Sequence, residues 1–454
     1  MNKQNKRRNR THDGGKHIAR LTFALAITAF FIAGPAHAQT ADLGQVLHEV
    51  EAHAPALKAA YANTDVFKSK RKVVRSQFLG EIDIFGHDLH FNDNRLTRPI
   101  APPINFPALT FDDNQIGYGV NARLPLDING RIRNSFHALT HQTNAAAENA
   151  ANLRLVLLNN AAKLFHGLEQ ISGQRAALQK QAEALQGHIK IASTAIEVGR
   201  TAPVERLRLV AELKRVEGKL AGLDGIEAGL RARLAALLER QLFTEIVVAP
   251  SREPVSFSTQ KDSIKNRPDV LAAKEIEAAT NSGVKAAWAS FLPDFSANFT
   301  WLQNQGYNGS GTDDATWQIT FQARFPLWTG GRRTAQIGQA KAQRRAAQHQ
   351  KEAITENAVA ELVAARGAWM AAQAQYHAAK SGITAAAEVT RIQTDRFEQG
   401  RLSATDLVDA EAALAGARSE LAASLARWWQ ADDSLRLAMC LPPAAYGEEV
   451  KSEK

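Results

Sequence analysis

One pattern of residues occurs twice along this 454-residue chain, and this duplication limits the folds that the chain can adopt. Ala122-Arg123-Leu124-Pro125-Leu126 returns 201 residues later as Ala323-Arg324-Phe325-Pro326-Leu327, and Gly199-Arg200 returns at the same displacement as Gly400-Arg401. A constant displacement over so long a stretch indicates an internal repeat rather than chance matches at single positions.

A second displacement relates the parts of the two copies that precede these segments. Pro55 corresponds to Pro268, and Phe78-Leu79 to Phe291-Leu292, at a distance of 213 residues. The difference between the two displacements falls in the loop-like stretch 80–115. We therefore expect two repeats, each with the order helix, strand, strand, long helix, turn, helix. The expected boundaries are 39–240 for the first repeat, 241–265 for an equatorial linker, 266–440 for the second repeat and 441–454 for a C-terminal tail.

Each repeat contains a long stretch without proline that is rich in helix-forming residues. No proline occurs between Pro125 and Pro203 or between Pro326 and Pro442, and apolar residues recur in these stretches at steps of four and three. This heptad pattern predicts helices that supercoil against a neighbour. We expect long helices at about 131–197 and 332–398, each about 100 Å long, and second helices at about 204–241 and 405–438. In the first repeat the seam consists of Leu164, Leu168, Ile171, Leu178, Ala182, Leu185, Ile189, Ala192 and Ile196, interrupted by Arg175.

Segments of alternating polarity precede each long helix. Trp317, Ile319 and Phe321 alternate with polar residues, and Ile116, Tyr118 and Val120 do so in the first copy. Each segment is about ten residues long, which is the length of a membrane-spanning β-strand. The expected strands lie at about 80–91, 115–126, 294–303 and 315–327.

Four such strands cannot close a barrel, because an open sheet in lipid leaves unpaired backbone groups at its two edges. Three chains would supply twelve strands. The membrane interpretation therefore requires a homotrimer, whereas a half-buried sheet outside the membrane would not.

The N-terminal residues have the pattern of an export signal. A basic stretch is followed by the apolar run Leu21–Ala33 and by small residues up to Ala38, so we expect a signal peptide at 1–38. No cysteine follows the expected cleavage point, which argues against an N-terminal lipid anchor. The full chain has a net charge of +9, of which residues 1–38 contribute +6, so the remainder is close to neutral and gives no support to a nucleic-acid partner.

The sequence shows no constellation of residues typical of an enzyme. Cys440 is the only cysteine and we interpret it as a small buried apolar residue. His137, His141, His166 and His188 lack the spacing of metal ligands, and no nucleophile motif is present. We therefore expect no catalytic site, no metal and no cofactor. Gly330-Gly331-Arg332-Arg333 could suggest phosphate binding, but a helix start is the favoured interpretation.

Three segments of the second repeat carry a family resemblance. They are Asn266-Arg267-Pro268-Asp269-Val270, then 325–333 (Phe-Pro-Leu-Trp-Thr-Gly-Gly-Arg-Arg), then 397–410, which begins Phe-Glu-Gln-Gly-Arg-Leu. In this order, on a duplicated frame, they resemble the TolC family of outer-membrane efflux and secretion channels. The resemblance covers nearly the whole chain after the signal.

The resemblance implies an α+β membrane protein that acts as an exit duct. Family architecture is a trimer with a 12-stranded β-barrel in the outer membrane and a periplasmic α-barrel tunnel made of coiled-coil helices. The implied partners are a periplasmic adaptor protein and an inner-membrane pump of the RND, ABC or MFS class. Drugs, metal ions, siderophores and secreted proteins all stay open as substrates. The alternative from the residues alone is an exported periplasmic coiled-coil scaffold or adaptor without a pore.

Two glycine-containing turns are expected at the periplasmic end of the helices. Glycine supplies the positive φ that ends a helix, and this structural role accounts for part of the pattern. We further expect these tips to dock the adaptor. The residues concerned are Gly199, Arg200 and Thr201 in the first turn and Gly400, Arg401, Leu402 and Ser403 in the second.

Asp406 and Asp409 are the candidate residues of an entrance gate. They lie three residues apart and therefore on one helix face, and the matching family positions hold acidic residues that ring the closed entrance. Rings of carboxylates give a narrow pore a charge filter. The alternative is that they are acids stabilised by the helix N-terminus, which suits Asp406 better than Asp409. Leu402 replaces a charged residue of the family's type member, so the latch of the closed state is left open.

Overall fold

A computed structural model describes residues 42–238, 253–254, 264–307 and 315–447 of the chain. The expected signal peptide at 1–38 lies outside the described residues, as do most of the linker 241–265 and the end of the C-terminal tail. No helix among the described residues has both the length and the apolar character needed to cross a membrane.

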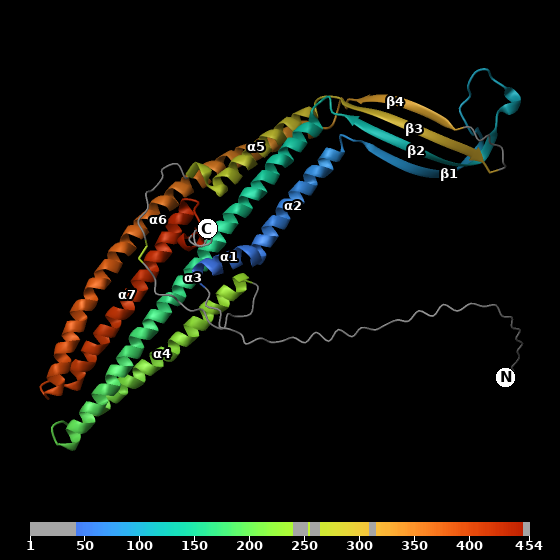
Figure 1. Ribbon diagram of the computed structural model, residues 1–454. Coiled ribbons are helices and arrows are strands. Elements are labelled where there is room, and N and C mark those ends of the chain that lie inside the picture. The colour runs from blue at the N-terminus through green and yellow to red at the C-terminus, as the bar shows by residue number, and fades with distance from the viewer. Residues whose placement is uncertain (1–41, 239–252, 255–263, 308–314, 448–454) are drawn as a thin grey trace, which may run out of the picture. The chain divides into compact units, whose positions relative to one another are not determined.

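The described residues form two copies of the expected order of elements (Figure 1). The first copy consists of α1 (Leu43–His53), α2 (Pro55–Ser76), β1 (Glu81–Leu96), β2 (Phe111–Leu126), α3 (Arg131–Glu197) and α4 (Pro203–Leu238). The second consists of α5 (Pro268–Ala289), β3 (Asp294–Gly306), β4 (Thr316–Arg324), α6 (Arg332–Glu398) and α7 (Ala404–Ala438). Short 3-10 helices lie at Phe106–Ala108, Ile264–Asn266 and Ala444–Gly447.

The bounds of these elements show the duplication directly. Helices α2 and α5 both begin at a proline and contain 22 residues, and helices α3 and α6 both contain 67 residues. The fold class expected from the sequence, two repeats with long helices and four antiparallel strands, is thereby confirmed. Strands β1 and β2 are longer than expected, at 16 residues each.

The start of each long helix explains the glycines that precede it. Gly130 and Gly331 have φ angles of 73° and 79° and form the N-cap residues of α3 and α6. At α3, the Asp127 carboxylate accepts hydrogen bonds from the backbone N–H groups of Ile132 and Arg133 at 2.7 and 2.8 Å, so two of the unpaired donors of the first turn are satisfied. The double glycine at 330–331 therefore marks a helix start.

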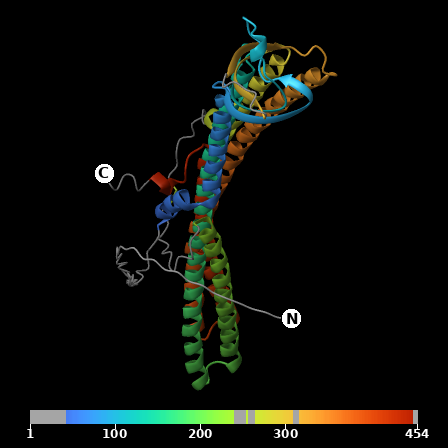
Figure 2. The same ribbon diagram turned by 90° about the vertical axis from the view of Figure 1, so that its right-hand side faces the viewer.

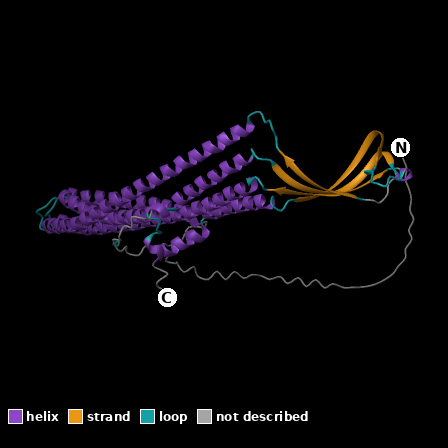
Figure 3. Ribbon diagram, turned by 90° about the horizontal axis from the view of Figure 1, so that it is seen from above, coloured by secondary structure: helices purple, strands orange, loops and turns teal. Residues whose placement is uncertain are grey.

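The four strands form one antiparallel sheet in the order β1-β2-β3-β4. The central pair, β2 and β3, joins the two repeats, while β1 and β4 form the edges. Figure 3 shows the strands as a single strongly curved layer beyond the ends of the helices.

The helices pack along their length around α3, which contacts α2, α4, α5 and α7 (Figures 1 and 2). One buried cluster contains Val46, Leu57, Leu158 and Leu234, each from a different helix. Another, toward the tips, contains residues of α3, α4, α6 and α7. Arg175, the polar residue in the expected apolar seam, pairs with Asp224 and Glu227 of α4 at 2.7 and 2.5 Å, which explains how the seam accommodates it.

Candidate functional site

The sheet has one apolar face and one polar face. Residues that stand opposite each other in the strand register share a face, and the apolar face is largely uncovered: Ile84 is 85% exposed and Phe321 is 77% exposed. Toward the loops this face ends at the Asp88–His90 pair. Two successive rows of the apolar face are Ile82, Ala122, Phe299 and Ile319, then Ile84, Val120, Trp301 and Trp317.

The opposite face carries polar side chains in the intervening rows. Asp83, Asn121, Thr300 and Gln318 form one row across all four strands, and the Thr300 hydroxyl donates to the Asn121 side chain at 3.2 Å. Exposed aromatic and aliphatic side chains on one face and polar side chains on the other are the arrangement of a strand between lipid and water.

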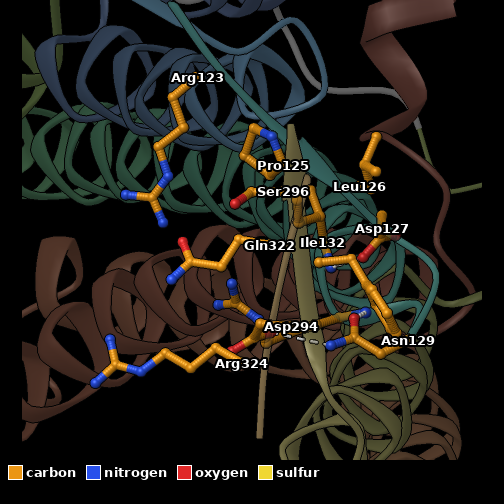
Figure 4. Close-up of a pocket in the computed structure, with 12 residues that line it drawn as sticks. Arg123, Pro125, Leu126, Asp127, Asn129, Ile132, Asp294, Ser296, Gln322 and Arg324 are labelled. Carbon is orange, nitrogen blue, oxygen red and sulfur yellow. Dashed lines mark hydrogen bonds and ion pairs between the residues drawn. The ribbon is translucent and has the colours of Figure 1, made fainter. Parts of the chain in front are cut away.

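A hollow of 190 Å³ lies on the polar face where the strands meet the helices. Arg123 and Arg324, which are equivalent in the two repeats, line it together with Gln322, and their side chains extend toward the same side of the strands (Figure 4). Asp294 accepts a hydrogen bond from Asn129 at 3.0 Å and lies 3.6 Å from Arg131. The last two contacts join β3 to the start of α3 and thus connect the repeats.

The first of the two expected turns, between α3 and α4, ends its helix with paired backbone hydrogen bonds. Gly199 has φ 70° and donates to the carbonyl of Ile196, while Arg200 donates to the carbonyl of Ala195 at 2.8 Å. This pattern is the Schellman motif, in which the left-handed residue is normally glycine. Gly199 and Arg200 are exposed and Thr201 is partly exposed.

The second turn, between α6 and α7, repeats this geometry. Gly400 has φ 73° and donates to the carbonyl of Phe397, and Arg401 donates to that of Arg396, both at 2.9 Å. Leu402 packs against the buried cluster of the helix tips. Its equivalent in the first turn is the polar Thr201.

A groove of 590 Å³ lies between the two turns. Ile191, Val198 and Phe397 give it apolar walls. Its charged residues are Lys190, Arg200 and Glu398. The residues come from the ends of α3 and α6, so the groove exists only because the tips of both repeats lie side by side.

The two candidate gate residues, Asp406 and Asp409, have different surroundings at the start of α7. The Ser403 hydroxyl caps α7: it accepts from the backbone N–H of Asp406 at 3.2 Å and donates to the Asp406 carboxylate at 2.8 Å. Asp406 thus belongs to the capping arrangement of the helix. Asp409 is exposed, and its carboxylate makes no hydrogen bond or ion pair with the described residues.

Sequence reasoning missed two residues that join the tips. Glu205 of α4 accepts from the backbone N–H of Ala404 at 2.6 Å, and Arg208 donates to the Thr405 hydroxyl at 3.0 Å. Glu205 and Arg208 also contact each other at 3.3 Å. Glu205 lies 201 residues before Asp406 and is its equivalent in the first repeat, but equivalence between repeats does not predict a contact.

Three histidines of α3 contact carboxylates of the second repeat. His141 lies 2.7 Å from Glu275 of α5, His166 lies 3.2 Å from Asp433 of α7, and His188 lies 3.0 Å from Glu411 of α7. Burial lowers the pKa of His166, but hydrogen bonds to Asp433 and Glu169 outweigh it and raise the pKa to about 9. Among the described residues no group of three or more such side chains has the arrangement of a metal site.

Two segments of the chain, residues 46–238 and 260–440, match the model of a protein family described as "Outer membrane efflux protein". The two matched segments correspond to the two repeats.

Known proteins with similar sequences include nodulation protein T of Rhizobium leguminosarum bv. trifolii, at 24% identity over 50% of this chain and 51% of that protein. The cation efflux system protein CusC of Escherichia coli K12 is 21% identical over 70% of this chain and 71% of its own length. The alignment thus spans about half the length of the first relative and about seven tenths of the second.

Solved structures share the fold over most of the chain. The outer membrane protein VceC of Vibrio cholerae has a TM-score of 0.75 at 19% identity and covers 87% of this chain and 95% of its own. The MtrE outer membrane channel of Neisseria gonorrhoeae, in its open state, has a TM-score of 0.75 at 18% identity, with 88% and 89% covered.

Proposed function

Because the chain belongs to the family of outer membrane efflux proteins, we propose that it is the channel subunit of a tripartite efflux or type I secretion system. Three copies form a homotrimer in outer-membrane lipid and extend into the periplasm as a helical tunnel. A periplasmic adaptor and an inner-membrane pump of the RND, ABC or MFS class complete the system. The pump supplies the energy, so the duct acts as a passage and not as an enzyme.

The observation that carries this proposal is the two-faced sheet. Side chains such as Ile84 and Phe321 would be costly in water, whereas in lipid their exposure is favourable. The polar row that contains Asn121 and Thr300 then faces a water-filled interior. A coiled-coil scaffold without a pore has no use for an uncovered apolar sheet face.

The direct test is the behaviour of the purified mature protein. We expect detergent-stable trimers in the outer-membrane fraction and stepwise conductance when the protein is added to planar lipid bilayers. A protein that stays monomeric, dissolves without detergent and leaves bilayers non-conducting would instead support the scaffold.

We further propose that the tips dock the adaptor, with the groove between the two turns as the contact surface. The groove presents apolar walls and three charged residues, Lys190, Arg200 and Glu398, which suits a helical hairpin of mixed polarity. Exchange of Arg200 and Arg401 for Glu should reduce efflux in cells and retention of the adaptor on the channel. Trimer yield and conductance of the same variant serve as the control, and undiminished efflux would count against tip docking.

For the entrance we propose that Asp409 supplies most of the charge filter. The Asp406 carboxylate is engaged with Ser403, whereas Asp409 is exposed and unpaired among the described residues. Asp409→Asn should therefore lower cation selectivity, measured as the reversal potential in a salt gradient, more than Asp406→Asn does. Equal shifts in the two variants would contradict this division of roles.

A further inference from the structure

We propose that neighbouring copies pair β4 of one chain with β1 of the next in a register that the internal duplication determines. The inference rests on the proposed function, in that it concerns copies of this chain assembled around one channel. It specifies which residues of the two edge strands stand opposite each other.

The two hairpins of the sheet have equivalent registers. Glu81 pairs with Arg123 in the first hairpin, and Asp294 pairs with Arg324 in the second. These pairs are related by 213 residues in the first strand and 201 residues in the second, which are the displacements of the whole repeat. The repeats are therefore equivalent at the level of single backbone pairs.

The pairing of β2 with β3, which joins the two repeats, predicts how β4 pairs with β1 of the next chain. Within the chain, β2 pairs with β3 so that Arg123 stands opposite Asn298 and Val120 opposite Trp301. The equivalents of β2 and β3 across the chain boundary are β4 and the neighbour's β1. The same displacements place Arg324 opposite Phe85 of the neighbouring copy, Gln322 opposite its His87, and Thr320 opposite its Leu89.

This register matches the chemistry of both faces. A slip of one residue would exchange the faces, but here Arg324 and Phe85 both lie in rows of the polar face. On the apolar face, Phe325 meets Ile84 and Leu327 meets Ile82. These four side chains are 47%, 85%, 88% and 75% exposed within one chain, and the pairing sets them side by side on the face assigned to lipid.

The register also places charges in favourable positions. Arg324 stands diagonally from Asp83 of the neighbouring copy, within reach for a long side chain. Within one chain neither side chain makes a hydrogen bond or ion pair with another described residue. In addition, β4 ends at Arg324 as an edge strand, whereas its equivalent β2, with partners on both sides, continues to Leu126.

The helices can be compared across copies by the same displacements. In the repeat, α3 is equivalent to α6, α5 to α2 and α7 to α4. Because α3 contacts α5 and α7 within the chain, we expect α6 to contact α2 and α4 of the neighbouring copy. His188 is buried against Glu411, but its equivalent Val389 is 52% exposed. The repeat displacement of 201 residues places Val389 against Val210 of the neighbouring copy.

The same replacement of polar by apolar residues holds for all three histidine–carboxylate contacts between the repeats. Their equivalents between copies are pairs of small apolar residues, which pack closely when another chain covers them. The pairs are Ala342 with Ala62, Gly367 with Ala232, and Val389 with Val210. A polar seam within the chain and an apolar seam between chains distinguish the two contacts, so that each helix finds the correct neighbour.

Paired cysteines in the edge strands test the register. Leu89→Cys is combined with Thr320→Cys, the position opposite, or with Gln318→Cys or Gln322→Cys, which lie on the same face but two residues away. Opposite residues have Cα atoms about 4.5–5.5 Å apart, within the range of a disulfide. A two-residue shift gives about 7–8 Å, beyond that range. We expect about tenfold faster crosslinking of Leu89→Cys with Thr320→Cys.

The native Cys440 stays in every variant, and single-cysteine variants measure its contribution. Burial raises the pKa of this thiol to about 11, which keeps it unreactive near neutral pH. Coexpression of two differently tagged chains, one with Leu89→Cys and one with Thr320→Cys, shows that the bond joins different copies when both tags occur in one crosslinked dimer.

The outcomes separate this proposal from the proposed function. Conducting trimers that crosslink fastest through Gln318→Cys or Gln322→Cys, or through none of the three pairs, overturn the register and leave the channel in place. A monomeric protein without conductance overturns both. Fast crosslinking through Thr320→Cys in conducting trimers establishes the register.

Discussion

His166 is a buried residue whose ionisation should affect the stability of the fold. It is 3% exposed and lies between Glu169 and Asp433, with its ring stacked on that of Trp429. An imidazolium between two carboxylates satisfies all three groups, whereas a neutral ring leaves the buried Asp433 and the partly buried Glu169 with weaker hydrogen bonds. The charged form of His166 therefore belongs to the folded state.

The stability of the protein should consequently fall at alkaline pH. The pKa of His166 in the folded state, about 9, is above its ordinary value. Its contribution is complete below about pH 6.5 and is lost as the pH rises through about 9. We expect the melting temperature in detergent to drop more between about pH 7 and pH 10 for the native protein than for His166→Gln.

The test compares the drop in melting temperature of the native protein with that of His166→Gln. A comparison is needed because lysines and tyrosines also titrate near the upper end of this pH range. Thermal melts followed by near-ultraviolet circular dichroism at several pH values would measure both drops. Parallel pH profiles for the native protein and His166→Gln would show that His166 is not protonated in the fold.

At the scale of the helices, the effect of a glycine depends on its backbone conformation. Gly400 has a positive φ in the Schellman turn, whereas Gly187 lies inside α3 with an ordinary helical φ. A Cβ atom added to either residue would meet no atom within 4 Å. The two substitutions by alanine therefore differ only in backbone energetics.

We expect Gly400→Ala to destabilise the protein by about 1 kcal/mol, because alanine disfavours the left-handed region. Gly187→Ala should stabilise it by up to about 1 kcal/mol, since alanine is the better helix former. Denaturant or thermal unfolding in detergent measures both changes. Shifts of the same sign in the two variants would mean that the second turn does not hold Gly400 in a left-handed conformation.

Elements that depend on local patterns could be predicted from the sequence, while contacts distant in the chain could not. The proline-free stretches and the alternating segments predicted the long helices and the strands, because both signals are periodic and local. The cap that Glu205 provides to Ala404 joins residues 199 positions apart. No spacing rule predicts such a contact, because it depends on how the two tips pack.

The candidate site residues divide in the same way. The sequence predicted Gly199 and Gly400 as helix ends because only glycine readily adopts the required φ. It indicated that a helix N-terminal role suits Asp406 better than Asp409, but it could not predict which carboxylate would be engaged in a hydrogen bond. The Ser403 hydroxyl makes the difference, and its orientation follows from the packing of the turn. Adaptor docking and the entrance gate stay predictions.

At the scale of the whole molecule, we expect the two faces of the sheet to determine whether the protein inserts into a membrane. Phe321 and Gln322 are neighbours in β4, but Phe321 lies on the apolar face and Gln322 on the polar face. An arginine in contact with lipid costs about 2–4 kcal/mol near the membrane midplane, whereas an arginine in the aqueous interior costs little.

Phe321→Arg should therefore reduce insertion into lipid vesicles and the yield of trimers, and Gln322→Arg should leave both near the native level. Flotation of vesicles followed by gel analysis without heating quantifies inserted trimer. The two variants carry the same new charge one residue apart, so each is the control for the other. Similar losses in both would contradict the assignment of lipid to the Phe321 face.

The stagger of the strands accounts for their unexpected length. Glu81 lies level with Thr320 across the four strands, and in the proposed ring Thr320 adjoins residue 89 of the next copy. If three chains close the ring in this register, the strands are displaced by about 80 Å along their length over a circumference of about 58 Å. This corresponds to a tilt of about 55° from the axis, which is steeper than the roughly 35–45° usual in barrels. A strand of 16 residues is about 54 Å long and rises only about 30 Å at this tilt, which is the thickness of the hydrocarbon layer. In the proposed ring, the long strands would therefore cross an ordinary bilayer along an oblique path.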